Sequence, residues 1–402
     1  MERKMKDLLC RVLTLFSIMV LLLCVNGYAQ ESRGVTDSVI KVGIIQDVTG
    51  PTAVSGINYV EGIRNYFRHI DEKGGINGRK LKVIHEDDHY SIPNAIAAFK
   101  KLVFRDKVLA ILGGGGTGQM TALLSQIKKQ KMPLFTISQA EKMVMPFRRH
   151  IFIPSATYED QIRVMVDYVM KDLKAKNPRI AMVYSDNEFG KTARDAAKIR
   201  VEKYGLKLVD QEVIGMGAVD ATSQVLALKR AKANYIVIQN AVGATVALLK
   251  DARKYGYSPV FIGIHPAVDD TVRIAKGAAK NFIGAYNFAF WHEDTPGVRE
   301  MKEITFKYKP GSKPRIVYYI LGWVTAMEFV EGIKRAGKDL NGESLINGTE
   351  SIKGFDTGGL TGPISYSSKS HKGSKYCIIR KADVDKGWMV PLTGWRKPVS
   401  LE

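Results

Sequence analysis

The 402-residue sequence predicts an α/β fold of two doubly wound, Rossmann-like lobes. Short β-rich runs alternate with amphipathic helical segments, as in proteins built on parallel sheets. One strand plus one helix recurs roughly every 25 to 30 residues without sequence similarity between the repeats, which excludes a solenoid. Hydrophobic residues make up 45% and charged residues 25% of the chain, as in ordinary folded proteins.

The first α/β unit begins with Val39–Ile45, an apolar run typical of a buried strand. The rest of the unit keeps the alternation of short β-rich and longer amphipathic segments. We expect further strands at Lys80–His85, Val108–Leu112 and Leu134–Ile137, and helices at Pro93–Arg105 and Gln119–Lys131.

A second unit begins near Ala156 and repeats this pattern. We expect helices at Glu159–Lys174, Lys191–Tyr204, Ala221–Ala231 and Ala244–Tyr255, and strands at Arg179–Tyr184, Lys207–Val213, Tyr235–Gln239 and Val260–Gly263. The last third of the chain is helical at Pro296–Tyr308 and Arg315–Arg335 and rich in strand formers at Tyr366–Arg380. These segments are expected to return to the lobes, which requires several crossings between them.

Residues 1–29 have the pattern of a cleaved signal peptide. Basic residues at Arg3, Lys4, Lys6 and Arg11 precede the apolar run Val12–Val25, and small residues at Gly27 and Ala29 suit a signal peptidase. Cleavage after Ala29 changes the formal net charge from +20 to +18 and leaves Cys377 as the single cysteine, so no internal disulfide is expected. The protein is therefore expected in the periplasm; a retained membrane anchor and a lipid-modified Cys24 stay open as alternatives.

The segment Gly113–Gly118 satisfies G-x-G-x-x-G, directly after a strand and before a helix, and Glu141 lies about twenty residues further on. Glycines there let backbone N–H groups at a helix N-terminus approach an anionic or polar ligand. A dinucleotide is disfavoured because the motif follows a later strand and the chain is expected to be exported. We therefore predict a loop that contacts a small ligand.

No catalytic constellation is evident. The segment 85–89, with two histidines and three acids, ends a strand and so lacks helical spacing for a metal; a solvated loop is expected. A G-x-S-x-G elbow and a Gly-Lys-Ser/Thr phosphate loop are both missing from the sequence. Basic residues are scattered and not interleaved with aromatics, which argues against nucleic acid as a partner. The expectation is a binding protein, not an enzyme, with no cofactor and no metal.

Several motifs resemble a known family. Thr49-Gly50-Pro51 follows the first strand, Gly74-Gly75-Ile76-Asn77-Gly78-Arg79-Lys80 follows the first helix, and Asp87-Asp88 and Asn187-Glu188-Phe189-Gly190 come after later strands. This combination resembles the branched-chain amino acid-binding type of periplasmic binding protein, the extracytoplasmic receptor of ABC importers, over nearly the whole mature chain. The resemblance implies a type I (Venus-flytrap) fold of two lobes joined by three hinge crossings.

Lobe boundaries follow from this resemblance. It implies an N-terminal lobe of residues 37–154 plus 291–368 and a C-terminal lobe of residues 155–288 plus 373–402. The hinge strands are expected near Phe152–Ala156, Tyr286–Trp291 and Ser367–Ser374.

The resemblance also implies a ligand site between the lobes. The residues that match the family's positions are Ser55, Gly116, Thr117, Ser138, Gln139, Ala140, Phe189, Ala241 and His265. Three of them depart from the amino-acid-binding pattern. His265 stands where a carboxylate usually pairs with the ligand ammonium, Ala140 replaces a hydroxyl, and Ala241 lies where an aromatic is usual.

These departures bear on the ligand, because a buried ammonium without an anionic partner would cost several kcal/mol. His265 can donate a hydrogen bond or carry a positive charge. We therefore favour an aromatic or aliphatic carboxylic acid, with a branched-chain amino acid as the alternative if Glu141 or Asp269 supplies the missing charge. Phe189 would pack against an apolar ligand body.

The predicted function is capture of a small ligand by a monomeric receptor that delivers it to an ABC transporter permease. Ligand binding would shift the population of lobe arrangements toward the closed one. A secreted sensor of the same fold and an enzyme with a Rossmann-like site are the alternatives.

Overall fold

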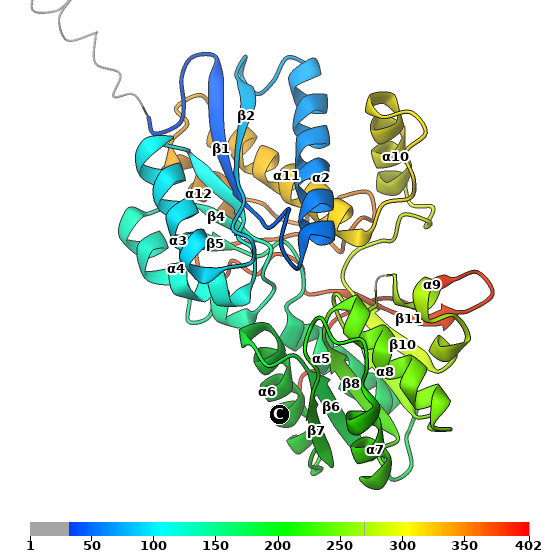
Figure 1. Cartoon of the computed structure of the whole chain (residues 1–402). Helices are drawn as coiled ribbons and strands as arrows, with labels where there is room; N and C mark the ends of the chain where they lie inside the picture. Colours follow the sequence, from blue (N-terminus) through cyan, green and yellow to red (C-terminus); the bar gives the residue numbers. More distant parts are fainter. Residues whose placement is uncertain (1–31, 269, 402) are drawn as a thin grey trace, which may run out of the picture.

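The computed structural model describes residues 32–268 and 270–401. The predicted signal peptide, Cys24 and Asp269 lie outside these residues. Figure 1 shows two α/β lobes, one above the other, and so confirms the predicted fold class. In the described part of the chain, no helix is both long and apolar enough to cross a bilayer.

Lobe 1 has a parallel sheet in the order β2-β1-β3-β4-β5. Its strands are β1 (Val39–Ile45), β2 (Lys80–Glu86), β3 (Ala110–Gly113), β4 (Leu134–Thr136) and β5 (Ile151–Phe152). Its helices are α2 (Ala53–Glu72), α3 (Ile92–Lys100), α4 (Thr117–Gln130), α10 (Pro296–Tyr308), α11 (Val317–Ala336) and α12 (Gly342–Glu350). The last three come from the C-terminal third of the chain, as expected.

Lobe 2 has a sheet in the order β12-β11-β10-β9-β8-β6-β7, parallel from β7 to β10 and antiparallel at β11 and β12. Its strands are β6 (Ile180–Tyr184), β7 (Asp210–Val213), β8 (Tyr235–Gln239), β9 (Val260–Gly263), β10 (Phe282–Tyr286), β11 (Cys377–Asp383) and β12 (Trp388–Arg396). Its helices are α5 (Tyr158–Asp167), α6 (Glu188–Glu202), α7 (Thr222–Arg230), α8 (Val242–Lys254) and α9 (Thr271–Ala275).

Short helical turns extend or link these elements: η1 (Lys101–Arg105), η2 (Glu141–Met143), η3 (Tyr168–Asp172) and η4 (Lys276–Ala279). The predicted strand-rich segment Tyr366–Arg380 is mostly a lobe-to-lobe crossing, and its regular strand begins only at Cys377. The reason is that residues 365–374 hydrogen-bond to one another, to Ile352 and to the crossing at Ile153 and Pro154, and so do not form a continuous strand.

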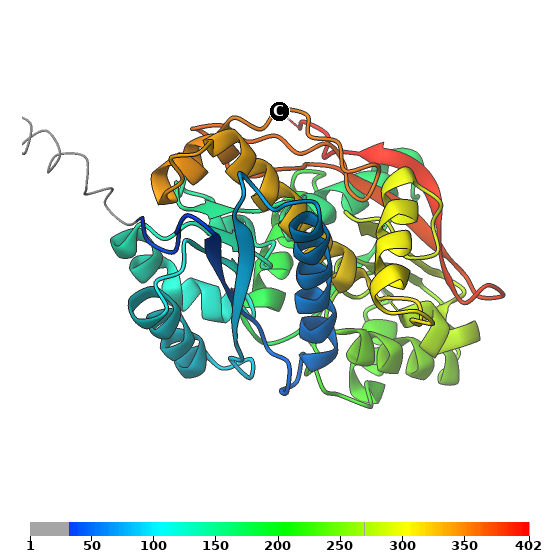
Figure 2. The same cartoon turned by 90° about the horizontal axis from the view of Figure 1, so that it is seen from above.

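Helices α2 and α11 form the outer layer of lobe 1 and lie side by side in Figure 2. Glycines allow the close approach: a Cβ on Gly62 would lie 2.2 Å from the Tyr319 carbonyl oxygen, and one on Gly322 would lie 2.1 Å from that of Tyr59. Both helices begin at the junction between the lobes, so their packing fixes two segments that border the cavity described next.

Candidate functional site

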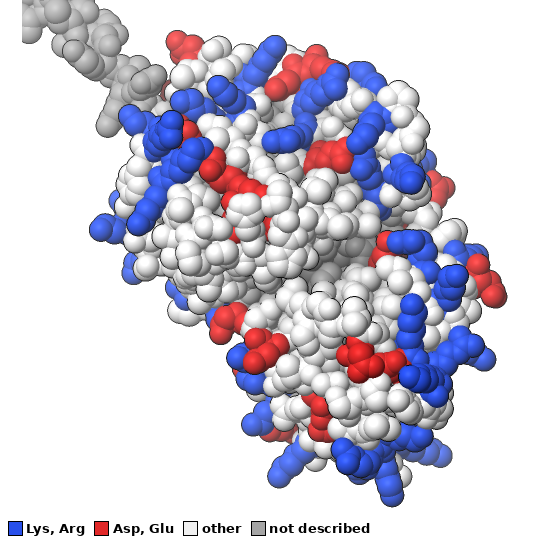
Figure 3. Space-filling view, in the orientation of Figure 1, with Lys and Arg blue, Asp and Glu red and all other residues white. Residues whose placement is uncertain are grey.

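A cavity of about 550 Å³ lies between the lobes. It opens where the carboxyl ends of the parallel strands of both sheets meet, the usual place for a ligand in doubly wound folds. In Figure 3 the surfaces that face each other across the junction are mostly uncharged. The lining comes from both lobes, so a ligand held here would touch both.

Seven of the nine predicted site residues line this cavity: Ser55, Gly116, Thr117, Ser138, Phe189, Ala241 and His265. Gln139 and Ala140 do not. Gln139 is fully buried beside the crossings, where its Oε1 accepts from Gln161 Nε2 and Asn287 Nδ2, both at 2.9 Å. Ala140 is fully buried in a hydrophobic core. The chain therefore turns away from the cavity directly after Ser138.

The glycine-rich loop shapes one polar corner. Gly115 has φ +66°, and a Cβ there would lie 1.9 Å from the Asp88 carboxylate, so glycine is required. The loop ends at Gly116, and α4 begins with Thr117, whose Oγ1 lies 2.9 Å from Ser138 Oγ. The first N–H groups of a helix have no partner within the helix. Two hydroxyls and a helix N-terminus thus converge on one point, which favours an anion.

Other helices also begin at the cavity. Ser55 lies in the first turn of α2, Phe189 is the second residue of α6, and Ala241 precedes α8. The Asn187 side chain accepts from the Gly190 N–H and so fixes the start of α6. Helix dipoles from both lobes therefore present partial positive charge to a ligand.

His265 follows β9 and is almost completely buried. Its backbone N–H donates to Gln161 Oε1 at 2.9 Å, and its ring Nδ1 lies 2.5 Å from the Tyr286 hydroxyl oxygen. The rings of Tyr158 and Tyr318 lie 6.2 and 5.0 Å from the imidazole, measured between centroids. Burial lowers the pKa of His265 to about 3. Of the two expected roles of this side chain, burial therefore favours the neutral hydrogen-bonding group over the positive charge.

Charged groups in the described lining are few. Asp270 lines the cavity beside Arg273, and Arg273 Nη2 lies 2.5 Å from Asp270 Oδ2. Glu141, the alternative partner for a ligand ammonium, does not line the cavity. Asp269, the other alternative, lies outside the described residues. Within residues 32–268 and 270–401, the lining thus offers an ammonium only one carboxylate, and an arginine already pairs with it.

Three chain segments pass between the lobes and are hydrogen-bonded to one another. The Ile153 N–H donates to the His371 carbonyl at 3.0 Å, and the Gly373 N–H donates to that of Ile153 at 2.8 Å. Asn287 Nδ2 lies 2.9 Å from both Ser155 Oγ and the Ala156 carbonyl. Each of the three expected hinge segments therefore takes part in this contact.

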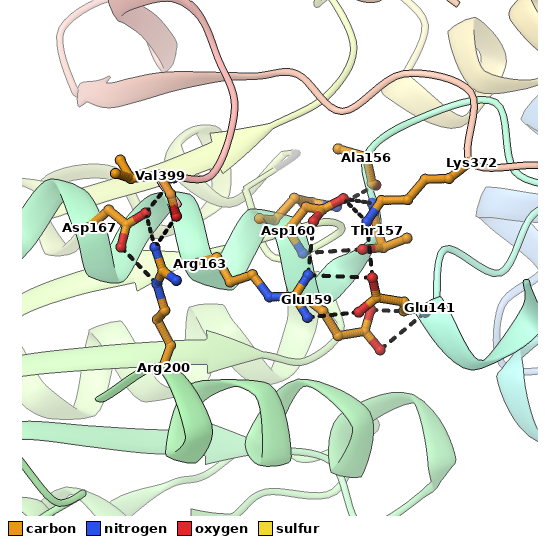
Figure 4. Close-up of polar contacts among 11 residues, drawn as sticks. Glu141, Ala156, Thr157, Glu159, Asp160, Arg163, Asp167, Arg200, Lys372 and Val399 are labelled. Atoms are coloured by element: carbon orange, nitrogen blue, oxygen red, sulfur yellow. Dashed lines mark hydrogen bonds and ion pairs between the residues drawn. The ribbon is translucent and has the colours of Figure 1, made fainter. Parts of the chain in front are cut away.

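An ion cluster lies beside these crossings and is drawn in Figure 4. Lys372 Nζ lies 2.6 Å from Asp160 Oδ2 and 3.0 Å from Glu141 Oε1. Arg163 donates to the same two carboxylates at 3.0 and 2.7 Å, and Glu159 accepts from the Glu141 N–H. Burial alone would raise the pKa of Glu141, but Arg163 and Lys372 hold this pKa below its ordinary value. Glu141 thus joins lobe 1 to α5 and to the third crossing.

Glu328 in α11 is a buried acid tied to the hinge. The Tyr366 hydroxyl is within hydrogen-bond distance of both Glu328 Oε2 and, at 3.1 Å, the Ile153 carbonyl, but its one proton can serve only one of these two acceptors. Burial raises the pKa of Glu328 to about 8. A protonated Glu328 resolves the conflict, because it donates to Tyr366, which then donates to Ile153.

We expect the Glu328→Gln variant to lose less stability than the parent as pH rises. The folded protein keeps this proton up to about pH 8, whereas an ordinary glutamate releases it near 4.5, so stability falls between these values. Glutamine has no such proton, so the variant should lack this loss of unfolding free energy, which is on the order of 3 kcal/mol between pH 5 and pH 8. Urea unfolding of both proteins at the two pH values measures the loss. An equal loss in the parent and the variant would contradict the protonated state of Glu328. Glu159, whose pKa burial raises to about 7, contributes equally to both proteins.

Sequence reasoning missed several lining residues, among them Gln46, Tyr90, Tyr158, Met216 and Tyr318. Gln46 directly follows β1, and its Oε1 is buried without a hydrogen-bond partner. The rule that ligands bind beyond the carboxyl ends of strands could have found it, together with Tyr90 after β2. Tyr318 is the second residue of α11, far along the chain, and no sequence motif around it indicates a ligand site.

The chain resembles known proteins over most of its length. The protein family described as "Periplasmic binding protein" matches residues 39–387. "Leu/Ile/Val-binding protein homolog 7" of Brucella abortus (strain 2308) is 23% identical over 342 residues, which cover 81% of this chain and 80% of the relative.

Solved structures of other proteins have a similar fold. A branched chain amino acid ABC transporter protein from Thermus thermophilus, solved with bound valine, has a TM-score of 0.83 at 26% identity and covers 90% of this chain and 97% of its own. A fatty acid ABC transporter substrate-binding protein from Thermomonospora curvata has a TM-score of 0.81 at 23% identity, with coverage of 92% and 95%.

Proposed function

Because the chain belongs to the periplasmic binding protein family, we propose that it is the extracytoplasmic substrate-binding protein of an ABC importer. Its ligand is a carboxylate with an apolar body and no ammonium group. The protein acts as a monomer. It holds the ligand between its lobes and delivers it to membrane permease subunits. The proposal places the protein in the periplasm after signal peptide removal and gives it no catalytic step.

The observation that carries the ligand class is the charge of the cavity lining. The α4 N-terminus and the one hydroxyl proton that the bond between Thr117 and Ser138 leaves free offer donors to a carboxylate. Opposite them stands a neutral histidine, and the one acid in the described lining is paired with Arg273. An ammonium here would be desolvated without a free anion, which costs several kcal/mol.

In this proposal Thr117, Ser138, Gly116 and Ser55 bind the carboxylate end, and His265 donates a hydrogen bond to it from Nε2. Phe189 and Ala241 contact the apolar body. The closed arrangement gains contacts from both lobes, so the ligand shifts the population toward it.

A matched pair of ligands tests the proposal. 4-Methylpentanoate is leucine without its ammonium group, so the two differ at one position. We expect 4-methylpentanoate to raise the melting temperature of the mature protein, since a ligand at 100 times its Kd adds about 2.7 kcal/mol, and leucine to leave it unchanged. Valine and isoleucine serve as further amino acids.

Branched-chain amino acids are the competing ligand class, because the Thermus thermophilus structure holds valine. Stabilisation by leucine but not by 4-methylpentanoate would establish them and refute the carboxylate proposal. Asp269→Asn then reports whether that residue supplies the anion: the substitution would abolish leucine binding.

A further inference from the structure

Apolar side chains from both lobes form much of the cavity wall. Val54 and Ile316 of lobe 1 and Met216, Val242 and Ile274 of lobe 2 line it, beside polar groups that include the Asp270–Arg273 ion pair. Val54 is 68% exposed and Ile274 is 39% exposed. Large apolar side chains left open to water on both sides of a cleft mark a binding surface.

The cavity is also larger than a leucine-sized ligand needs. A cavity of about 150 Å³ accommodates benzene, which is roughly 25 Å³ for each non-hydrogen atom. On that scale the 550 Å³ have room for about 20 such atoms in the present arrangement of the lobes. Leucine has about nine, so a ligand of that size would fill the cavity only after further closure of the lobes, whereas a ligand of about twice that size fills it as it stands.

Two glycines keep this space open. Gly217 and Gly243 line the cavity, and a Cβ on either would meet nothing within 4 Å. Neither has a positive φ, so the backbone does not demand glycine at these positions. Gly243 is the second residue of α8, where a larger residue would favour the helix. A side chain here would extend into open space at the cavity and shorten the room for a ligand.

We propose that the ligand is a carboxylate with a long apolar tail of about eight to twelve carbons, and that Gly243 sets the tail length. This rests on the proposed function, which supplies the carboxylate end. The tail lies along the apolar walls toward the cleft mouth and covers Val54 and Ile274. Closure then buries apolar surface from both lobes against the ligand.

Calorimetric titration with a series of n-alkanoic acids from four to fourteen carbons tests the proposal. A second series of ω-phenylalkanoic acids is titrated in the same way, and all concentrations stay below the micellar range. We expect affinity to rise about fourfold for each added CH₂ group until the tail fills the cavity, and then to level off. In Gly243→Leu the maximum moves to shorter acids: binding of the twelve-carbon acid weakens at least tenfold, while that of the six-carbon acid stays within about twofold.

Gly394→Leu is the matched control. Gly394 lies in β12, outside the cavity lining, and a Cβ there also meets nothing within 4 Å. This variant is expected to bind every acid like the parent. Melting temperatures without ligand verify that both variants fold.

The outcomes separate this inference from the proposed function. Affinity that stops rising at six carbons, with Gly243→Leu indistinguishable from Gly394→Leu, overturns the long tail but keeps the carboxylate ligand. Binding of leucine with no binding of any acid overturns the proposed function itself.

Discussion

Replacing Lys372 by methionine is expected to lower the free energy of unfolding by about 3 kcal/mol. Lys372 is 13% and Asp160 5% exposed in their side chains, so the pair is largely dehydrated. The cluster at the crossings holds the acids Glu141, Glu159 and Asp160. Methionine retains most of the side-chain volume but leaves Arg163 as the one base among the residues drawn in Figure 4 that contacts Glu141 and Asp160. Buried carboxylates that lose their partner are costly.

Urea unfolding measures this effect. Lys369→Met is the matched control on the same crossing, because Lys369 is exposed, and a change within about 0.5 kcal/mol is expected there. Adding Asp160→Asn to Lys372→Met removes one of the acids that then share Arg163, and restores about half of the loss. A single variant as stable as the parent would show that the cluster does not hold the hinge segments together.

The second large effect is on binding: His265→Glu is expected to weaken carboxylate binding at least 100-fold at pH 7.5, or about 2.7 kcal/mol. A neutral donor is then replaced by a second negative charge beside the ligand, with little water to screen it. Burial raises the pKa of a glutamate, so the loss should shrink when the titration is repeated at pH 5, where more of the side chain is protonated. The same variant is expected to gain measurable affinity for leucine.

His265→Gln separates charge from shape. Its amide donates a hydrogen bond without charge, so carboxylate affinity should stay within about tenfold of the parent. Calorimetric titration of the three proteins gives the comparison, and their ligand-free melting temperatures verify folding. If the glutamate variant binds carboxylates within threefold of the parent, His265 does not face the ligand.

Much of this architecture is predictable because it depends on local pattern. Buried parallel strands are short apolar runs, and the helices between them are amphipathic, so alternation along the chain revealed both lobes. The motifs from Thr49 to Asp88 predicted a family that the match over residues 39–387 confirms. The resemblance to that family, and not a local pattern, implied the nine site residues, and the seven that line the cavity lie where sheet topology brings strand ends together.

The rest depends on distant contacts. Ser138 and Gln139 are neighbours in sequence, yet only Ser138 lines the cavity, because Asn287 and Gln161 hold the Gln139 side chain at the crossings. The neutral state of His265 follows from burial among rings contributed by α5, β10 and α11. No local pattern encodes such contacts, and they decide which residues can meet a ligand and with what charge.

The order of elements along the chain has a consequence for synthesis. Neither lobe is continuous: lobe 1 needs α11 to cover α2, and lobe 2 needs β11 to cover the edge of β10. During synthesis the N-terminal part of the chain is made first. The face of α2 that α11 covers and the edge of β10 that β11 pairs with therefore stay exposed until the last segments have been made. Both lobes are thus completed late, because each depends on elements from the last third of the chain.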